Sequence, residues 1–328
     1  MDNARDTLSR LLNLLADGRF HSQKCLSLAL SLTPSSLEEN LSQLLKNAFQ
    51  LEKHDKKGYR LIGGLELLDE AKIREQLGSN NHPLQQLEIL SIIDSTNSYL
   101  LKKRHSDQTI AVFAEQQIAG RGQFNRQWLS NPAKNIALSL LWQQPSNGPM
   151  QQLDGLSLAM GLAVVLALND YGLTGAQVKW PNDIVFQGKK LAGILIETHC
   201  STAGVYKPVI GIGLNLYPPS HDTTLNQEKI TDLQAIQTKP IQRNKIAGLL
   251  LKHSLNVLTQ FQRGGFLSLH KEWEKLDSLS NQPIRLKTNQ ATYLGTAHGV
   301  NALGQLCVSI KGQLSYFSHG EASLSNND

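Results

Sequence analysis

Residues Ala114–Trp128, with the sequence AEQQIAGRGQFNRQW, are the most informative stretch of this chain. An apolar run beginning at Thr109 leads into them, and Gly120, Arg121 and Gly122 then open a polar loop. The two glycines let the backbone approach a ligand closely, and the arginine offers a forked, permanently charged donor for phosphate or carboxylate. The pattern predicts a loop that folds over an anionic ligand, although glycine–arginine turns also occur in ordinary loops.

Three further motifs accompany this loop in a fixed order. They read DSTN at 94–97, KWPND at 179–183 followed by GKKLAGIL at 188–195, and GIGLN at 211–215. The order and spacing of the four motifs are far more specific than any one of them, and together they resemble the catalytic domain of biotin protein ligases. The resemblance extends to both ends of the chain, and the full layout is similar to the bacterial family of bifunctional biotin ligases and biotin-operon repressors.

Length and composition limit the class of protein. A chain of 328 residues suggests two or three domains, and a hydrophobic fraction of 40% is enough for real cores. The net charge of +5 fits a protein that meets phosphates but does not require nucleic acid. The three cysteines, Cys25, Cys200 and Cys307, lie far apart and form no CxxC pair, so neither a disulfide framework nor a zinc site is favoured.

The N-terminal residues carry acids and lack the apolar core of a signal peptide. The longest apolar stretch, 156–168, is too short to span a bilayer and is typical of a buried helix. We therefore expect a cytoplasmic protein with no membrane partner.

Residues 1–65 are expected to form a winged helix-turn-helix DNA-binding domain, with three helices and a hairpin. Leucines from Leu8 to Leu15 recur at helical spacing, Ser22 can cap the second helix, and Thr33 can cap the third with Pro34 at its first position. The expected strands are 49–52 and 58–62. The leucines of the third helix that we expect to face inward are Leu37, Leu41, Leu44 and Leu45.

The pattern of residues 66–275 predicts an α+β domain with a mixed or antiparallel sheet, and the resemblance implies that it is a catalytic domain of the biotin/lipoate ligase type. Its expected helices lie at 67–77, 98–103, 153–168 and 243–261. Its expected strands lie at 87–93, 109–114, 136–142, 177–180, 183–187, 191–198 and 209–216. Residues 276–328 predict a small SH3-like β-barrel with strands at 283–287, 291–297, 305–310 and 313–317.

Joining a carboxylic acid to an amine requires an activated acyl group, which ATP can supply by adenylating the carboxylate. Two anions must then meet, so the site must neutralise charge, exclude water and align both partners. Lys190 is the best candidate for the central cation, because it begins an apolar strand. A solvated hairpin lysine like Lys189 is the commoner case, but the resemblance implies a catalytic role, because Lys190 aligns with the ligase lysine that contacts biotin and the acyl phosphate.

The resemblance also assigns other binding residues. Asp183 would coordinate magnesium or orient the incoming lysine, although an aspartate after a Pro-Asn turn is often only structural. Trp128 and Trp180 are expected to shape the pocket walls. The implied biotin-binding residues are Ser95, Thr96, Asn97, Gln117, Arg121, Gly122, Gln123 and Lys190, of which the first three also suit an ordinary helix cap. The implied nucleotide-binding residues are Lys179, Asn182, Gly211, Gly213 and Asn215, although a glycine pair in a strand is equally compatible with a bulge.

Two segments depart from the family pattern. The family loop usually reads Gly-Arg-Gly-Arg-Arg-Gly-Arg, whereas Gln123, Phe124 and Asn125 here replace two arginines and a glycine. Gln123 occupies the position whose arginine helps to retain the reactive adenylate, so we expect adenylation to survive and retention to weaken. The third helix carries Glu38 and Glu39, which are unfavourable near a polyanion unless they contact cytosine.

The first 65 residues hold nine Lys and Arg against seven Asp and Glu, so the winged helix is expected to bind DNA weakly. Most of the attraction is expected from the basic turn between Lys53 and Arg60. The candidate DNA-binding residues are Thr33, Ser35, Ser36, Asn40, Lys56 and Lys57.

The resemblance therefore implies an ATP- and Mg²⁺-dependent enzyme that forms biotinyl-5′-AMP. It would transfer biotin to a lysine of the biotin carboxyl carrier protein of acetyl-CoA carboxylase. An additional role would be repression at biotin operator DNA, which the chain would bind only as a ligand-bound homodimer. Two alternatives stay open, namely a regulator that mainly senses biotin and a lipoate or octanoate ligase of the same fold.

Overall fold

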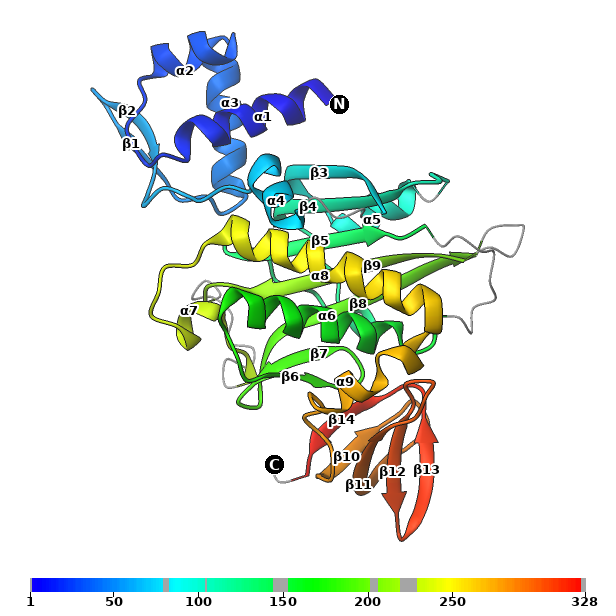
Figure 1. Cartoon of the computed structure of the whole chain (residues 1–328). Coiled ribbons are helices and arrows are strands. Elements are labelled where there is room, and N and C mark those ends of the chain that lie inside the picture. Colours follow the sequence, from blue (N-terminus) through cyan, green and yellow to red (C-terminus); the bar gives the residue numbers. More distant parts are fainter. Residues whose placement is uncertain are drawn as a thin grey trace.

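Three regions follow one another along the molecule (Figure 1). The computed structural model describes residues 2–78, 83–103, 105–143, 153–200, 206–218 and 229–325. Within them, N-terminal helices and a two-stranded hairpin precede a seven-stranded sheet, and a five-stranded sheet ends the chain. The predicted α+β class and the order of the three units are confirmed.

The N-terminal unit consists of α1 (Asp2–Leu15), α2 (Gln23–Leu30), α3 (Pro34–Lys46) and the hairpin β1 (Leu51–His54) and β2 (Gly58–Leu61). Both predicted caps are present, since Ser22 and Thr33 accept hydrogen bonds from the backbone of Cys25 and Ser36. The leucines of α1 and α3 form a core of their own. The prediction that Leu45 faces inward was wrong: it is 54% exposed, because Leu37, Leu41 and Leu44 complete the apolar stripe and Leu45 lies beyond its edge.

The central sheet is mixed, as predicted. Only β3 and β4 pair in parallel, and every other neighbouring pair is antiparallel. The strands in spatial order are β3 (Leu84–Ile93), β4 (Thr109–Gln117), β5 (Asn135–Leu141), β9 (Tyr206–Asn215), β8 (Lys189–Cys200), β7 (Asp183–Phe186) and β6 (Ala176–Lys179).

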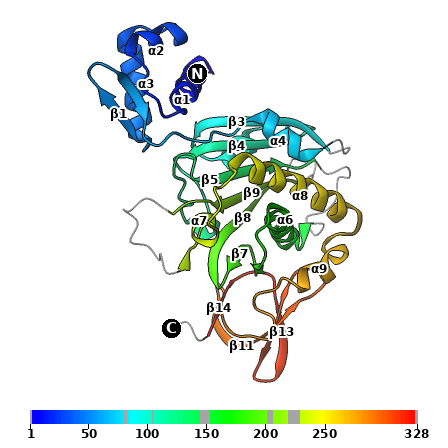
Figure 2. The same ribbon diagram turned by 60° about the vertical axis from the view of Figure 1, so that its left-hand side comes forward.

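Helices cover the two faces of this sheet unequally (Figures 1 and 2). The apolar α6 (Leu156–Tyr171) and α8 (Arg243–Gly264) pack together over one face and bury the main core. The short α5 (Thr96–Lys102) covers part of the other face, above Ile110, Val112 and Val209. The remaining helices are α4 (Glu70–Leu77), α7 (Leu233–Ile236), α9 (His270–Glu274) and the 3₁₀ turns η1 (Gln123–Asn125) and η4 (Phe266–Ser268).

The C-terminal unit is a five-stranded antiparallel sheet with the order β13, β12, β11, β10, β14. The prediction missed the last strand. Its core is continuous with that of the central region, and the Trp180 indole donates a hydrogen bond to the Gly304 carbonyl. The strands are β10 (Pro283–Lys287), β11 (Thr292–Val300), β12 (Leu306–Ile310), β13 (Gln313–Phe317) and β14 (Glu321–Leu324).

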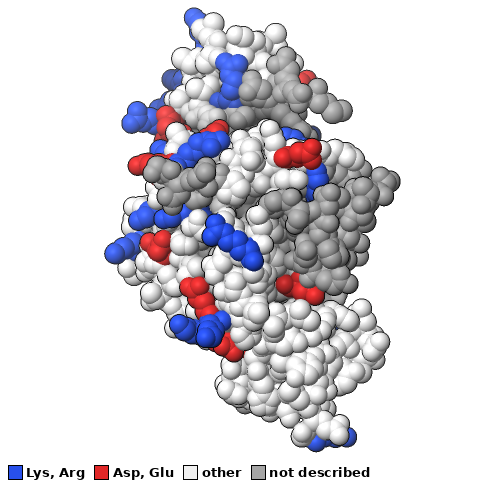
Figure 3. Space-filling view, turned by 45° about the vertical axis from the view of Figure 1, so that its right-hand side comes forward, with Lys and Arg blue, Asp and Glu red and all other residues white. Residues whose placement is uncertain are grey.

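Charged side chains are interspersed on the face shown in Figure 3, where basic and acidic groups lie near one another. The C-terminal unit, lowest in that view, is largely uncharged except at its tip. Within the described ranges, no helix combines the length and apolar character needed to cross a membrane.

Candidate active site

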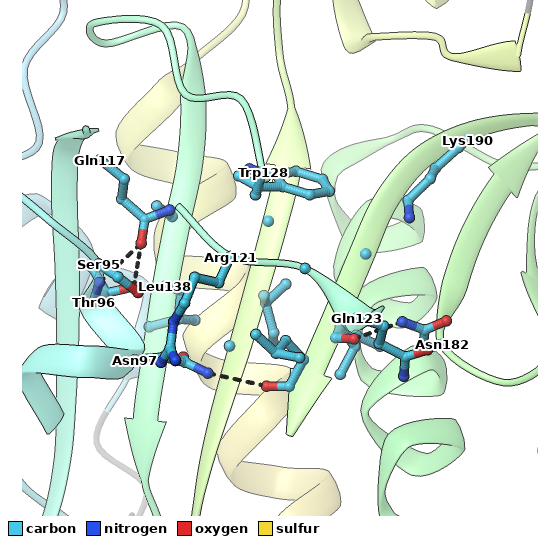
Figure 4. A pocket seen from close by; sticks show the side chains of 18 residues that line it. Ser95, Thr96, Asn97, Gln117, Arg121, Gln123, Trp128, Leu138, Asn182 and Lys190 are labelled. Carbon is cyan, nitrogen blue, oxygen red and sulfur yellow. Dashed lines mark hydrogen bonds between the residues drawn. The ribbon is translucent and has the colours of Figure 1, made fainter. Parts of the chain in front are cut away.

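A pocket opens on the α5 side of the central sheet, away from α6 and α8, where the Gly120–Trp128 loop crosses β8 and β9 (Figure 4). Side chains from four strands, α5 and the loop converge there. The predicted residues that line it are Ser95, Thr96, Asn97, Gln117, Arg121, Gly122, Gln123, Asn182, Lys190, Gly211 and Gly213, together with Trp128.

Small residues on neighbouring strands create the hollow. A Cβ at Gly213 would lie 2.4 Å from the Trp128 indole, and one at Gly211 would lie 2.5 Å from Asn97 Oδ1. A Cβ at Gly193 would meet both Trp128 and Lys190. The pairing of β9 with β5 and β8 continues without a shift through both of its glycines, so these glycines do not form a bulge.

One end of the pocket is neutral and polar. Ser95 caps α5 through the backbone N–H of Ser98, while Thr96 donates from its N–H and its hydroxyl to Gln117 Oε1, at 2.9 and 3.0 Å. Ser95, Thr96 and Asn97 are each at most 3% exposed. The cap therefore places three buried polar residues at the pocket floor, and the structural and binding interpretations of this motif coincide.

The other end is cationic. Lys190 Nζ lies 2.6 Å from Asp183 Oδ1 and 5.8 Å from the centroid of the Trp128 ring, so it is not a freely solvated hairpin lysine. Lys179 lies opposite Asp183 in the register of β6 and β7. Burial lowers the pKa of Lys179, and the nearby Asp183 carboxylate partly opposes this effect. Asp183 is thus set between two lysines.

The glycine loop is tied to the sheets at two points. Arg121 Nη2 lies 2.7 Å from Glu197 Oε2 of β8, and Arg126 Nη1 lies 2.5 Å from Glu321 of β14. Between them the chain forms η1, in which Phe124 takes a positive φ of 55° and remains 55% exposed. The loop therefore carries its charge at its two ends and only neutral side chains at its tip.

Comparison with known proteins identifies the fold and the family. A family model for biotin/lipoate A/B protein ligases matches residues 89–215. The bifunctional ligase/repressor BirA of Salmonella typhimurium is 33% identical to this chain, over 96% of each protein. The chain belongs to this family of bifunctional ligase/repressor proteins.

Further family members agree with this assignment. The biotin–[acetyl-CoA-carboxylase] ligase of Mycobacterium tuberculosis is 31% identical and covers 77% of this chain and 94% of its own length. The solved biotin protein ligase of Aquifex aeolicus, in complex with biotin and ATP, superposes with a TM-score of 0.62 at 26% identity, covering 74% of this chain and 99% of that one.

Three residues predicted for this family's site do not line the pocket. Lys179 and Asp183 are not among its lining residues, although the Asp183 carboxylate contacts Lys190, and the Asn215 side chain accepts from Asn135 Nδ2 and donates to the Thr231 carbonyl. Asn182 does line it, but its amide donates to the Ile194 carbonyl. Trp180 was expected in the pocket wall and instead is buried in the core, where it contacts the C-terminal unit.

The sequence argument missed Glu197, Ser139 and Gly193, which also surround the pocket or contact its residues. Alternation along β8 was the available signal, since Gly193, Leu195 and Glu197 share one face of the strand.

Magnesium has a limited set of ligands here. Among the residues described, no group of three His, Cys, Asp or Glu could hold a metal ion. Asp183 is paired with Lys190, and magnesium usually uses one or two carboxylates together with substrate phosphates. The residues present therefore fit magnesium only as an ion carried by the nucleotide phosphates, beside Asp183.

The predicted DNA-binding residues are spread over two elements. Thr33 and Ser36 form the cap of α3, and Asn40 Nδ2 donates to the Ser36 carbonyl. Lys56 and Lys57 are exposed in the turn between β1 and β2. Ser35 is exposed on the first turn of α3.

Proposed function

We propose that this chain is an ATP-dependent biotin protein ligase, which forms biotinyl-5′-AMP and passes biotin to a lysine of the biotin carboxyl carrier protein of acetyl-CoA carboxylase. The observation that carries the proposal is the polarity of the pocket. Ser95, Thr96, Asn97 and Gln117 provide a neutral, hydrogen-bonding end, and Lys190 marks a cationic end beyond Trp128 (Figure 4). A ligand with a neutral urea at one end and a carboxylate at the other matches this order.

In the first step, a carboxylate oxygen of biotin attacks the α-phosphorus of ATP and pyrophosphate leaves. Lys190 would reduce the repulsion between the two anions, with Lys179 adding positive charge near Asp183, and Arg121 would contribute from the covering loop. Gly211, Gly213 and Asn182 line the same pocket and would border the nucleotide. Magnesium bound to the phosphates would supply further charge neutralisation.

In the second step, the ε-amine of the acceptor lysine attacks the acyl carbon, a proton is lost and AMP departs. Asp183 is the carboxylate nearest to Lys190 and is a candidate to orient that amine.

A lipoate or octanoate ligase of the same fold is the weaker alternative. An alkyl chain or dithiolane brings no hydrogen-bonding group to the polar Thr96, Asn97 and Gln117 side chains at this end of the pocket. A site that hydrogen-bonds its ligand rejects analogues that lack those groups.

A second proposed role is transcriptional repression at biotin operator DNA by a ligand-bound homodimer. Its support is the N-terminal unit together with the names of the full-length relatives, which describe ligase/repressors. A dimer suits the proposal because one winged helix covers a single half-site. A protein that mainly senses biotin, without ligation, is disfavoured by the Lys190–Asp183 pair, which repression alone does not require.

We also propose three domains with boundaries at 1–65, 66–275 and 276–328. The separate N-terminal core supports the first boundary. The second boundary divides one continuous core, so the C-terminal domain is expected to unfold together with the central one.

The decisive test combines purified protein, ATP, magnesium and a carrier domain with either biotin or lipoate, and follows pyrophosphate release and carrier modification. Biotin should be transferred and lipoate should not. Lys190→Ala should lower pyrophosphate release by about a hundredfold or more, with unchanged circular dichroism, because it removes a charge aimed at the converging anions. Near-normal release from that variant would exclude Lys190 from the mechanism.

A further inference from the structure

Glu197 on β8 is a charged group beside the pocket that the two reaction steps do not use. Its side chain is 24% exposed, and a single oxygen, Oε2, accepts from Asn97 Nδ2 at 2.9 Å and from Arg121 Nη2 at 2.7 Å. Figure 4 shows Asn97 and Arg121 next to each other at the pocket floor. Glu197 therefore contacts one residue at the neutral end of the pocket and one in the loop that covers it.

The contact with Glu197 determines which way round the Asn97 amide lies. Asn97 Nδ2 faces the Glu197 carboxylate and the Leu195 carbonyl, which is 3.3 Å away, and both of these groups can only accept. Asn97 Oδ1 must then point to Ser139 Oγ, 2.5 Å away. Because an amide oxygen also only accepts, the Ser139 hydroxyl proton is committed to Asn97.

The direction of that proton leaves the pocket floor short of a donor. Ser139 Oγ also lies 2.7 Å from Thr96 Oγ1, which lies 3.0 Å from Gln117 Oε1. These three oxygen–oxygen contacts share only the two hydroxyl protons of Ser139 and Thr96. With the Ser139 proton committed, the Thr96 hydroxyl can donate to Ser139 or to Gln117 but not to both, so one more oxygen lone pair is free for an N–H of the ligand.

A reversed Asn97 amide would occupy this lone pair. Its nitrogen would donate to Ser139, Ser139 would donate to Thr96, and Thr96 would donate to Gln117. All three contacts would then hold a proton, and the floor would offer one lone pair fewer to a donor. The negative charge of Glu197 prevents this arrangement, because it would place the Asn97 oxygen against a carboxylate.

We propose that Glu197 is a positioning residue that acts through Asn97 to keep the neutral end of the pocket an acceptor for the N–H groups of a cyclic urea. The proposal rests on the proposed function, since it concerns how the same pocket selects biotin.

The test is calorimetric titration of the full chain with biotin and with the two cyclic carbamates in which one or the other ring N–H is replaced by oxygen. The wild type should prefer biotin over the carbamate that lacks the critical N–H. Glu197→Gln removes the charge that opposes the reversed Asn97 amide and leaves only the longer contact with the Leu195 carbonyl against it, so it should lower this preference about tenfold, mainly by weakening biotin. Its affinity for that carbamate should change much less.

A matched control is Glu88→Gln on β3. Glu88 is also a partly buried carboxylate bonded to α5 and its end, through Tyr99 and Lys103, but it has no hydrogen bond to Asn97. This variant should keep the wild-type preference. In a double-mutant cycle, Asn97→Ala combined with Glu197→Gln should discriminate no worse than Asn97→Ala alone, because Glu197 acts through that residue.

An unchanged preference in Glu197→Gln, or additive effects in the cycle, would overturn the inference while leaving the ligase proposal intact. A wild-type protein that binds no biotin would overturn both. If Glu197→Gln yields little folded protein, Ser139→Ala takes its place, since it disconnects Asn97 from Thr96, so that Asn97→Ala should no longer change the preference. An effect of Asn97→Ala that persists in full in the Ser139→Ala background would refute the proton-direction argument.

Discussion

Asp277, where the central and C-terminal units meet, is predicted to destabilise the folded protein at neutral pH. It is 9% exposed, its Oδ1 accepts from the Leu279 N–H, and its Oδ2 is buried without a hydrogen-bond partner among the described residues. Burial raises the pKa of this carboxyl from its ordinary 3.8 to about 6, with a smaller contribution from Glu274. The folded state therefore keeps the proton at pH values where the unfolded chain has lost it.

The sign and size of the effect follow from this difference. Stability from the protonated group is fully present below about pH 4, falls as the pH rises from about 4 to 6, and is constant above that range. Relative to low pH, the folded protein has lost about 3 kcal/mol of stability at pH 7.5, where the loss is complete, and about 1 kcal/mol at pH 4.5. Asp277→Asn removes the titration and keeps an acceptor for Leu279, so its stability gain over wild type should be about 2 kcal/mol larger at pH 7.5 than at pH 4.5.

Urea unfolding at the two pH values measures this difference, with Asp55→Asn on the exposed β1–β2 turn as the control. Any fixed cost of burying the asparagine amide cancels, because it is the same at both pH values. An equal gain at pH 4.5 and 7.5 would refute the argument. Since the central and C-terminal cores are continuous, the gain should also appear in a single transition covering both units.

Three other predictions concern the pocket, its loop and DNA. Gly213→Ala places a Cβ 2.4 Å from the Trp128 indole, so biotin affinity, followed by tryptophan fluorescence, should fall about tenfold; an unaffected affinity would mean that the indole moves freely. Gln123→Arg should slow stopped-flow release of the adenylate about tenfold to a hundredfold by adding a charge-assisted contact, and unchanged release would exclude that contact. Replacing Glu38 and Glu39 by glutamine should tighten operator binding in gel shifts, with a gain that shrinks as salt rises; indifference to both changes would place DNA reading outside α3.

Local signals in the sequence predicted most of the architecture. Helix caps such as Ser22 and Thr33 depend on residues within a few positions, and both were placed correctly. The last strand, β14, was missed because its four residues pair with β10, nearly forty positions earlier, and short edge strands carry little pattern of their own. Trp180 was misplaced for a similar reason, since its partner Gly304 belongs to a different unit.

The pocket residues show the same difference between local sequence signals and contacts between distant segments. The DSTN motif and the glycine loop are each a continuous stretch of sequence, so each can be recognised by itself. The prediction that they converge with Lys190 came from the family resemblance. Glu197 lies outside those motifs, and its importance appears only when Asn97 and Arg121 are brought to the same carboxylate oxygen. Sequence spacing predicts which face of β8 it occupies, but not that two residues from distant segments share it.

The glycine loop is anchored on both sides of its altered tip. Arg126 is held by Glu321, whose hydrogen bond raises the pKa of the guanidinium, and this pairing leaves Arg126 less available to a ligand. Arg121 is paired with Glu197 at the other end of the loop. With Gln123, Phe124 and Asn125 between them, the tip has no charge to bring to an anion. Under the proposed function, Arg121 would have to contact the phosphate of the adenylate while Glu197 still holds Asn97, so the carboxylate proposed to orient Asn97 would also compete for Arg121.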